Sequence, residues 1–222
     1  GAAEMGQGAI SAMEQIAAEE LNIPISKVFV VKSDTSILPF DSTTTASRTT
    51  VIMGKAVQKA AQEIKKKLIK RTAEYLQVKE DEISIIDGEV VANGERVSIS
   101  EILHQTKHKY GIEICEIGQH IISPTNSPLG GSTPFWEPCW VATEVEVNPN
   151  TGKVKVCSLL TAVDAGRAIN LQQVEGQDVG SSMQGLGAAL HEQMVFEYGV
   201  LSNPSVIQYR LPLIGDLPEK FG

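Results

Sequence analysis

The chain has 222 residues, 42% of them hydrophobic, so it can build either one large globular domain or two small ones. Its 27 acidic residues outnumber its 19 basic residues, and the formal net charge of −8 argues against a surface that wraps nucleic acid. The apolar runs are short and broken by charges, far from the ~20 residues that span a bilayer, so we expect a soluble, cytoplasmic protein with no membrane partner.

The first third of the chain predicts two helices and a strand. It begins on GAAEMGQG, without an initiator Met or a signal segment, so we expect a piece of a longer polypeptide. Apolar residues at helical spacing predict a helix over 9–21. The β-branched run from Val28 to Val31 predicts a short buried strand. After FDSTTTASRTT, residues 40–50, apolar residues every three or four positions predict a long second helix.

The segment EISIIDGEVVANGERVSI predicts short antiparallel strands. Its dipeptides Asp87-Gly88 and Asn93-Gly94 tolerate the positive φ of tight turns. Either Ser98 or Ser100 can cap a short helix over 101–109.

Residues 117–136 are rich in Pro, Gly and Ser and predict an extended excursion over the surface. Two alternating segments, CWVATEVEV and KVKVCSLLTAVD, follow and predict a long hairpin. The cysteines are odd in number and form no CxxC pair, which predicts small, buried, reduced thiols rather than disulfides or metal ligands: Cys115, Cys139 and Cys157.

A third helix is predicted after Asn170, its expected cap. Glycines inside a helix cost stability, so four of them predict a close approach by another helix or a ligand: Gly176, Gly180, Gly185 and Gly187. Because helices and strands do not alternate strictly, the sequence predicts an α+β fold with mixed or antiparallel sheets and packed helices.

Three loops of small and polar residues run directly into predicted helices: GAAEMGQGA, DSTTTASRTT and DAGRAINLQQVEGQ. Helix N-termini expose unpaired N–H groups and favour anions, so the three entrances could converge on one ligand. Hydroxyls and amides suit phosphate, Gln suits heterocycle edges, and Arg48 and Arg167 can clamp phosphate. This inventory favours a phosphorylated heterocyclic cofactor. Alternatively, each loop is an ordinary helix cap, and Gln7 simply sits in a turn.

Five motifs, in order, resemble the C-terminal half of the molybdopterin-binding subunit in the xanthine dehydrogenase/aldehyde oxidase family of molybdenum hydroxylases. They are GAAEMGQG, TASRTTVIMGKAV, TEVEVNPNTGKVKV, AVDAGRAINLQQVEGQ and MQGLGAALHEQMVF. The resemblance implies a molybdenum-molybdopterin cofactor, in the cytosine dinucleotide form, that threads between these loops. It places Ala46 close to the metal, with no protein side chain as a metal ligand, and implies cofactor contacts from Gly6, Gln7, Gly8, Thr45, Ala46, Ser47, Arg48, Thr49 and Gln173.

The resemblance also implies a reaction, the hydroxylation of an N-heterocycle or aldehyde with oxygen derived from water. The family's general-base glutamate belongs to a GxGE stretch beyond LPE, past Gly222, so no catalytic residue is assigned here and this piece is expected to be inactive alone. Expected partners are the rest of the molybdopterin subunit, a 2Fe-2S subunit, an FAD subunit and a small-molecule substrate.

The expected organisation is a first lobe over 1–78 with the GQG and TASRTT loops, a variable insertion over 79–135, and a second lobe over 136–222 with the QQVEGQ helix entrance. Two alternatives to an enzyme part remain: a non-catalytic protein that binds or handles molybdopterin, and a structural interaction domain in which the three loops are only caps.

Overall fold

The computed structural model describes residues 1–31, 34–36, 38–41, 43–111, 113–122 and 135–221. The chain divides into two compact units, 1–134 and 135–222. The first holds helices α1 (Ala9–Leu21), α2 (Thr49–Leu76) and α3 (Ile99–Tyr110) and strands β1 (Ile83–Ile86), β2 (Glu89–Ala92) and β3 (Glu95–Ser98). The second holds β4 (Cys139–Val147), β5 (Val154–Val163), α4 (Leu171–Leu190), β6 (Phe196–Glu197), β7 (Val200–Leu201), α5 (Val206–Tyr209) and β8 (Lys220–Phe221). Helices with antiparallel and mixed sheets confirm the predicted α+β class.

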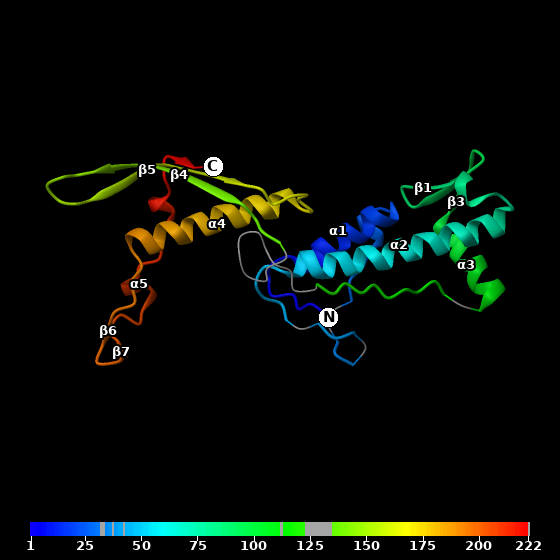
Figure 1. The fold of residues 1–222 in the computed structure, drawn as a ribbon, viewed down its shortest axis with the longest axis horizontal. Helices are drawn as coiled ribbons and strands as arrows, with labels where there is room; N and C mark the ends of the chain where they lie inside the picture. Colours follow the sequence, from blue (N-terminus) through cyan, green and yellow to red (C-terminus); the bar gives the residue numbers. More distant parts are fainter. Residues whose placement is uncertain (32–33, 37, 42, 112, 123–134, 222) are drawn as a thin grey trace. The chain divides into compact units, whose positions relative to one another are not determined.

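In the first unit, α1 lies along the N-terminal half of α2 (Figure 1). The contact is close because Gly54 of α2 has no side chain: a Cβ there would lie 2.8 Å from Cδ1 of Ile16. One turn further along α1, Glu20 accepts hydrogen bonds from Gln58 at 3.1 Å and Gln62 at 3.3 Å. These contacts advance along both helices in the same direction, so the N-termini of α1 and α2 lie at the same end.

The second half of α2 supports the three-stranded sheet and α3. The antiparallel order is β1-β2-β3, and both predicted turn dipeptides, Asp87-Gly88 and Asn93-Gly94, have positive φ. Ser98, one of the two expected caps, accepts a hydrogen bond from the backbone N of Glu101 at 3.1 Å. Part of the segment expected to be an insertion thus shares a core with α2, formed by Leu68, Ile83, Ile85, Val90, Ala92 and Ile102.

The predicted strand over Val28–Val31 is wrong. These residues form no strand, and the side chains of Phe29 and Val31 are 83% and 71% exposed. The run is apolar and β-branched, but no described strand pairs with it, and a strand needs a hydrogen-bonded neighbour. Of the predicted excursion over 117–136, residues 123–134 lie outside the described part, while Gly118 packs closely against α2 at Ala56.

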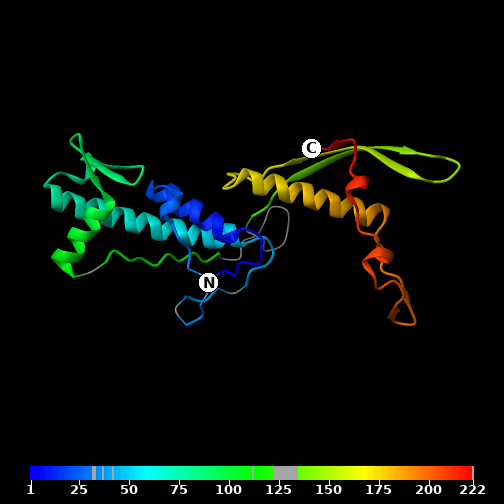
Figure 2. The same cartoon turned by 180° about the vertical axis from the view of Figure 1, so that it is seen from behind.

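The second unit is built on the long β4–β5 hairpin, which the sequence predicted, with β8 parallel to β5 (Figure 2). Among its described residues only Leu159 and Leu186 are buried hydrophobic residues. The predicted burial of the cysteines is wrong, since Cys115 and Cys139 are exposed and Cys157 is half-buried. For Cys139 the reason is that every residue of β4 is exposed.

The close approach expected at the helix glycines of α4 is found within this unit at one of the four, and at the other three it stays a prediction. A Cβ added at Gly176, Gly180 or Gly185 would meet no described atom within 4 Å. At Gly187 it would lie 2.6 Å from Cγ of Pro212. Only Gly187 therefore has a packing reason within this unit, because the chain after α4 folds back over that end of the helix.

Candidate functional site

The candidate site is the end of the first unit where α1 and α2 both begin and where the loops over 1–8 and 40–48 meet. The backbone N of Ala3 donates a hydrogen bond to Oγ1 of Thr44 at 3.0 Å, which joins the two loops. The structure thus brings together eight of the nine residues that the sequence nominated: Gly6, Gln7, Gly8, Thr45, Ala46, Ser47, Arg48 and Thr49. Gln173 belongs to the second unit and is described with it.

The entrance to α1 is held by a carboxylate of the chain itself. Glu4 accepts hydrogen bonds from the backbone N of Ile10 at 2.9 Å, of Gly6 at 2.8 Å and of Gly8 at 3.1 Å. These donors, Ile10 foremost, hold the pKa of the Glu4 carboxyl below its usual value. Helix N-termini favour anions, and here Glu4 is the anion. The expectation that this entrance binds a ligand's phosphate is therefore weakened.

The side chain of Gln7 closes the same loop. Its Nε2 donates to the carbonyl of Ala3 at 2.9 Å, and its Oε1 accepts from the backbone N of Met5 at 2.5 Å. This arrangement matches the alternative in which Gln7 sits in a turn. One N–H and one lone pair of the amide remain for a ligand, because an amide side chain has two of each.

The loop before α2 has an uncommon backbone. Ala46 and Ser47 are consecutive and both left-handed, with φ of 54° and 52°. This conformation costs roughly 1–2 kcal/mol for a non-glycine residue and is typically retained where function requires it. Both residues are exposed, as is Thr45, whose carbonyl accepts a hydrogen bond from the backbone N of Arg48 at 3.3 Å.

The N-terminus of α2 differs from that of α1, which the Glu4 carboxylate holds, and from that of α4, which Asn170 caps. Its N-cap residue, Arg48, makes no side-chain cap hydrogen bond, because a guanidinium has no acceptor atom. The guanidinium of Arg48 instead donates to Oδ1 of Asp41 at 3.2 Å, with the Asp41 side chain only 10% exposed. Within the described residues, the N-cap side chain of α2 supplies no cap hydrogen bond, and the positive end of this helix lies beside an exposed polar loop.

The third nominated entrance begins α4 in the second unit. Asn170 is its cap, as predicted: its Oδ1 accepts from the backbone N of Gln173 at 3.1 Å. Just before it, Oδ1 of Asp164 accepts from the backbone N of Gly166 at 3.0 Å, which shapes the turn. The side chain of Gln173 is half-buried, and Arg167 is exposed. This entrance is capped by its own sequence, so Gln173 is available only through its side chain.

The donor set at the α2 entrance suits a phosphorylated cofactor. Exposed hydroxyls, backbone N–H groups and a helix N-terminus bind phosphate oxygens, and the small side chain of Ala46 leaves room beside the left-handed backbone. Within the described residues, no three His, Cys, Asp or Glu side chains are grouped to hold a metal ion, and no helix is long and apolar enough to cross a membrane.

Two residues important to this geometry were not nominated from the sequence, Glu4 and Thr44. An acid four residues before a helix N-cap is the available signal for Glu4, because such acids reach first-turn amides. Thr44 has no local signal, since its partner Ala3 lies 41 residues away along the chain.

Residues 1–218 match the family model described as molybdopterin cofactor-binding domain. The chain is 30% identical to the putative xanthine dehydrogenase molybdenum-binding subunit of Escherichia coli (strain K12), over 99% of this chain and 29% of the relative. It is 32% identical to the nicotine 6-hydroxylase large subunit of Paenarthrobacter nicotinovorans, over 96% of this chain and 26% of the relative.

A solved structure has the same fold. Quinoline 2-oxidoreductase from Pseudomonas putida 86 matches with a TM-score of 0.79 and 23% identity, covering 99% of this chain and 28% of that one. The chain thus spans less than three-tenths of the length of each of these proteins.

Proposed function

The chain belongs to the molybdopterin cofactor-binding domains of the xanthine dehydrogenase and aldehyde oxidase family of molybdenum hydroxylases, and we propose that it supplies part of the cofactor cradle in the molybdopterin subunit of such an enzyme. Each of these relatives is more than three times as long as this chain, so the rest of the polypeptide would complete the cradle. In this proposal the enzyme oxidises an N-heterocycle or aldehyde with oxygen derived from water.

The observation that carries the proposal is the left-handed pair Ala46–Ser47 immediately before α2. The pair is exposed and costs conformational free energy, and it leads into a helix whose N-cap side chain makes no cap hydrogen bond. A ligand that accepts hydrogen bonds from this backbone would explain why the strain is retained.

Each nominated residue has a role consistent with its position. Thr45, Ser47 and Thr49 would donate hydroxyl or backbone hydrogen bonds to the phosphate and pterin of the cofactor. Ala46 would lie closest to the metal, where a larger side chain would crowd the substrate. Gly6, Gln7 and Gly8 would support this wall from the adjoining loop, which Thr44 ties to it.

Arg48 would offer its guanidinium to phosphate from a position held by Asp41. Gln173 would bond the pterin through its side-chain amide.

Molybdenum-molybdopterin, when bound, supplies the oxygen-transfer and two-electron chemistry. In this proposal the residues of this chain bind and orient the cofactor, and the general base comes from the rest of the polypeptide. We propose the cytosine dinucleotide form of the cofactor, a 2Fe-2S subunit and an FAD subunit for electron transfer, and a cytoplasmic location. The substrate class is supported by the names of relatives that act on nicotine or xanthine.

The test is to express the full reading frame with its neighbouring subunits and to measure molybdenum by mass spectrometry and released nucleotide by chromatography. About one molybdenum and one cytosine nucleotide per chain, with dye reduction by N-heterocycles or aldehydes, is expected. An assembled protein that contains molybdopterin but oxidises none of them would instead favour a cofactor-handling role. An assembled protein with no molybdopterin would refute both.

A further inference from the structure

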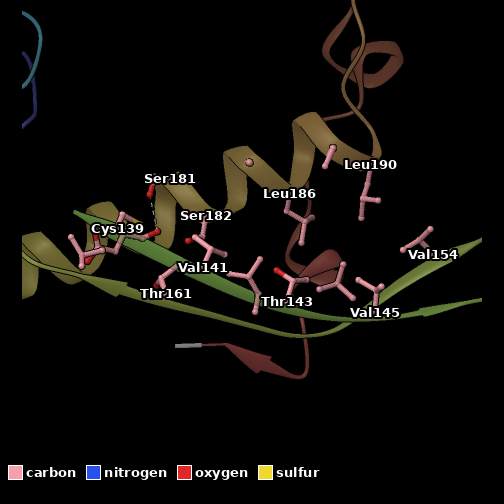
Figure 3. Close-up of a pocket in the computed structure, with 16 residues that line it drawn as sticks. Cys139, Val141, Thr143, Val145, Val154, Thr161, Ser181, Ser182, Leu186 and Leu190 are labelled. Atoms are coloured by element: carbon pink, nitrogen blue, oxygen red, sulfur yellow. Dashed lines mark hydrogen bonds between the residues drawn. The ribbon is translucent and has the colours of Figure 1, made fainter. Parts of the chain in front are cut away.

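The second unit contains an apolar groove of about 350 Å³ between α4 and one face of the β4–β5 hairpin (Figure 3). Figure 3 shows the side chains of Val141, Thr143 and Val145 on β4 and of Leu186 and Leu190 on α4 facing this space. Asp178 is the one charged residue among those that line it in the described part of the chain. The groove therefore suits an apolar occupant.

The second unit does not cover this face by itself. Val141 and Val145 are 59% and 51% exposed, and only Leu159 and Leu186 are buried hydrophobic residues among those described. A unit of this size that buries so little apolar surface lacks an independent core, because each buried side chain contributes only about 1.5–3 kcal/mol against the entropy of ordering the chain. Additional polypeptide must complete it.

The position of β8 indicates where that polypeptide comes from. β8 pairs parallel with β5 through Ser158↔Lys220 and Leu159↔Phe221 only. β5 continues to Val163, four residues beyond its last partner position with β8. Residues 160–163 therefore have a free length of strand edge on the side of β5 that faces away from β4, within the described part of the chain. Partners across a sheet carry their side chains on the same face, so Phe221 shares the groove face with Leu159, which lines the groove.

We propose, resting on the function proposed above, that the polypeptide following residue 222 extends β8 as a strand parallel to β5, alongside residues 160–163, and closes this side of the groove with its apolar face. The relatives are more than three times as long as this chain, which leaves ample polypeptide for such a strand. Side chains alternate along a strand, so the second and fourth residues after Phe221 face the groove beside Thr161 and Val163, and both are apolar.

The register makes the proposal testable in the full-length polypeptide. With Cys115, Cys139 and Cys157 replaced by Ser, a cysteine at the second residue after Phe221 is combined with Thr161→Cys. Strand neighbours on the same face lie about 5 Å apart, close enough for a disulfide or a short thiol cross-link. The matched control is Ala162→Cys with the same partner cysteine, because Ala162 points to the opposite face.

We expect efficient intramolecular cross-linking with Thr161→Cys, at least tenfold more than with Ala162→Cys. In native-state hydrogen exchange, alternate amides of residues 160–163, those that point away from β4, should be protected. Equal cross-linking by both variants, cross-linking by neither, or a cross-link only between two copies would overturn the proposal. Because the readout is independent of molybdenum content, failure here is distinguishable from failure of the proposed function.

Discussion

Glu4 and Ile10 fix the entrance to α1: Oε2 of the Glu4 carboxylate accepts a hydrogen bond from the backbone N of Ile10 at 2.9 Å. The other carboxylate oxygen accepts from Gly6 and Gly8, so one side chain satisfies three amides that a helix N-terminus and its preceding turn leave unpaired. The loop that adjoins the Ala46–Ser47 pair is thereby built around an internal anion.

Replacing Glu4 with Gln should loosen this loop. The carboxylate accepts charge-assisted hydrogen bonds that a neutral amide cannot match, so we expect a fall of a few degrees at most in the melting temperature at pH 7. The control is Glu95→Gln, an exposed acid at the start of β3.

The effect of Glu4 should depend on pH in one direction. Because hydrogen bonds, that of Ile10 foremost, lower the folded-state pKa of Glu4 below 4.5, its stabilising contribution is full above 4.5. It is lost as the pH falls through the lower folded-state pKa. The melting temperatures of wild type and Glu4→Gln should therefore converge in acid. A difference that grows on acidification would contradict this assignment.

Replacement by alanine should have opposite effects on stability at two glycines of α4, Gly180 and Gly187. Gly180 meets no described atom within 4 Å, so Gly180→Ala in the full-length polypeptide should raise the free energy of unfolding of the second unit by about 0.5–1 kcal/mol through helix propensity alone. Gly187→Ala should lower it by about 1–3 kcal/mol, because the new Cβ would overlap the rigid ring of Pro212. Denaturant titration measures both, and equal effects would refute this packing.

A substitution at Gly54 tests the packing of α1 on α2, which places the N-termini of both helices at the same end of the first unit. Gly54→Leu must displace Ile16, and we expect a loss of about 1–3 kcal/mol in unfolding free energy. Lys70→Leu, at an exposed position of the same helix, is the control and should change stability by no more than about 0.5 kcal/mol. Indistinguishable results would mean that α1 does not pack on α2 at this residue.

The sequence predicted well those elements whose structure depends on residues close together along the chain. The helix over Ala9–Leu21 follows from apolar periodicity, the turn at Asp87-Gly88 from positive φ, and the start of α4 from the cap at Asn170. The misprediction at Val28–Val31 has a different cause, since a strand depends on a partner that no local pattern reveals.

The candidate site was only partly readable from the sequence. The stretch before α2 was nominated for its hydroxyls, but the left-handed backbone of Ala46 and Ser47 carries no sequence signal, because both positions lack the Gly or Asn that usually marks it. The link between Ala3 and Thr44 spans 41 residues and depends on how α1 packs on α2.

The most direct test of the cofactor cradle is the molybdenum content of the assembled enzyme with Ala46→Phe. Thr43→Phe, which places the same ring at another exposed position of this loop, is the matched control. We predict that Ala46→Phe retains the fold by circular dichroism and loses turnover and most of its molybdenum, while Thr43→Phe keeps both. Full molybdenum content and unchanged turnover in Ala46→Phe would contradict the placement of the cofactor against this loop.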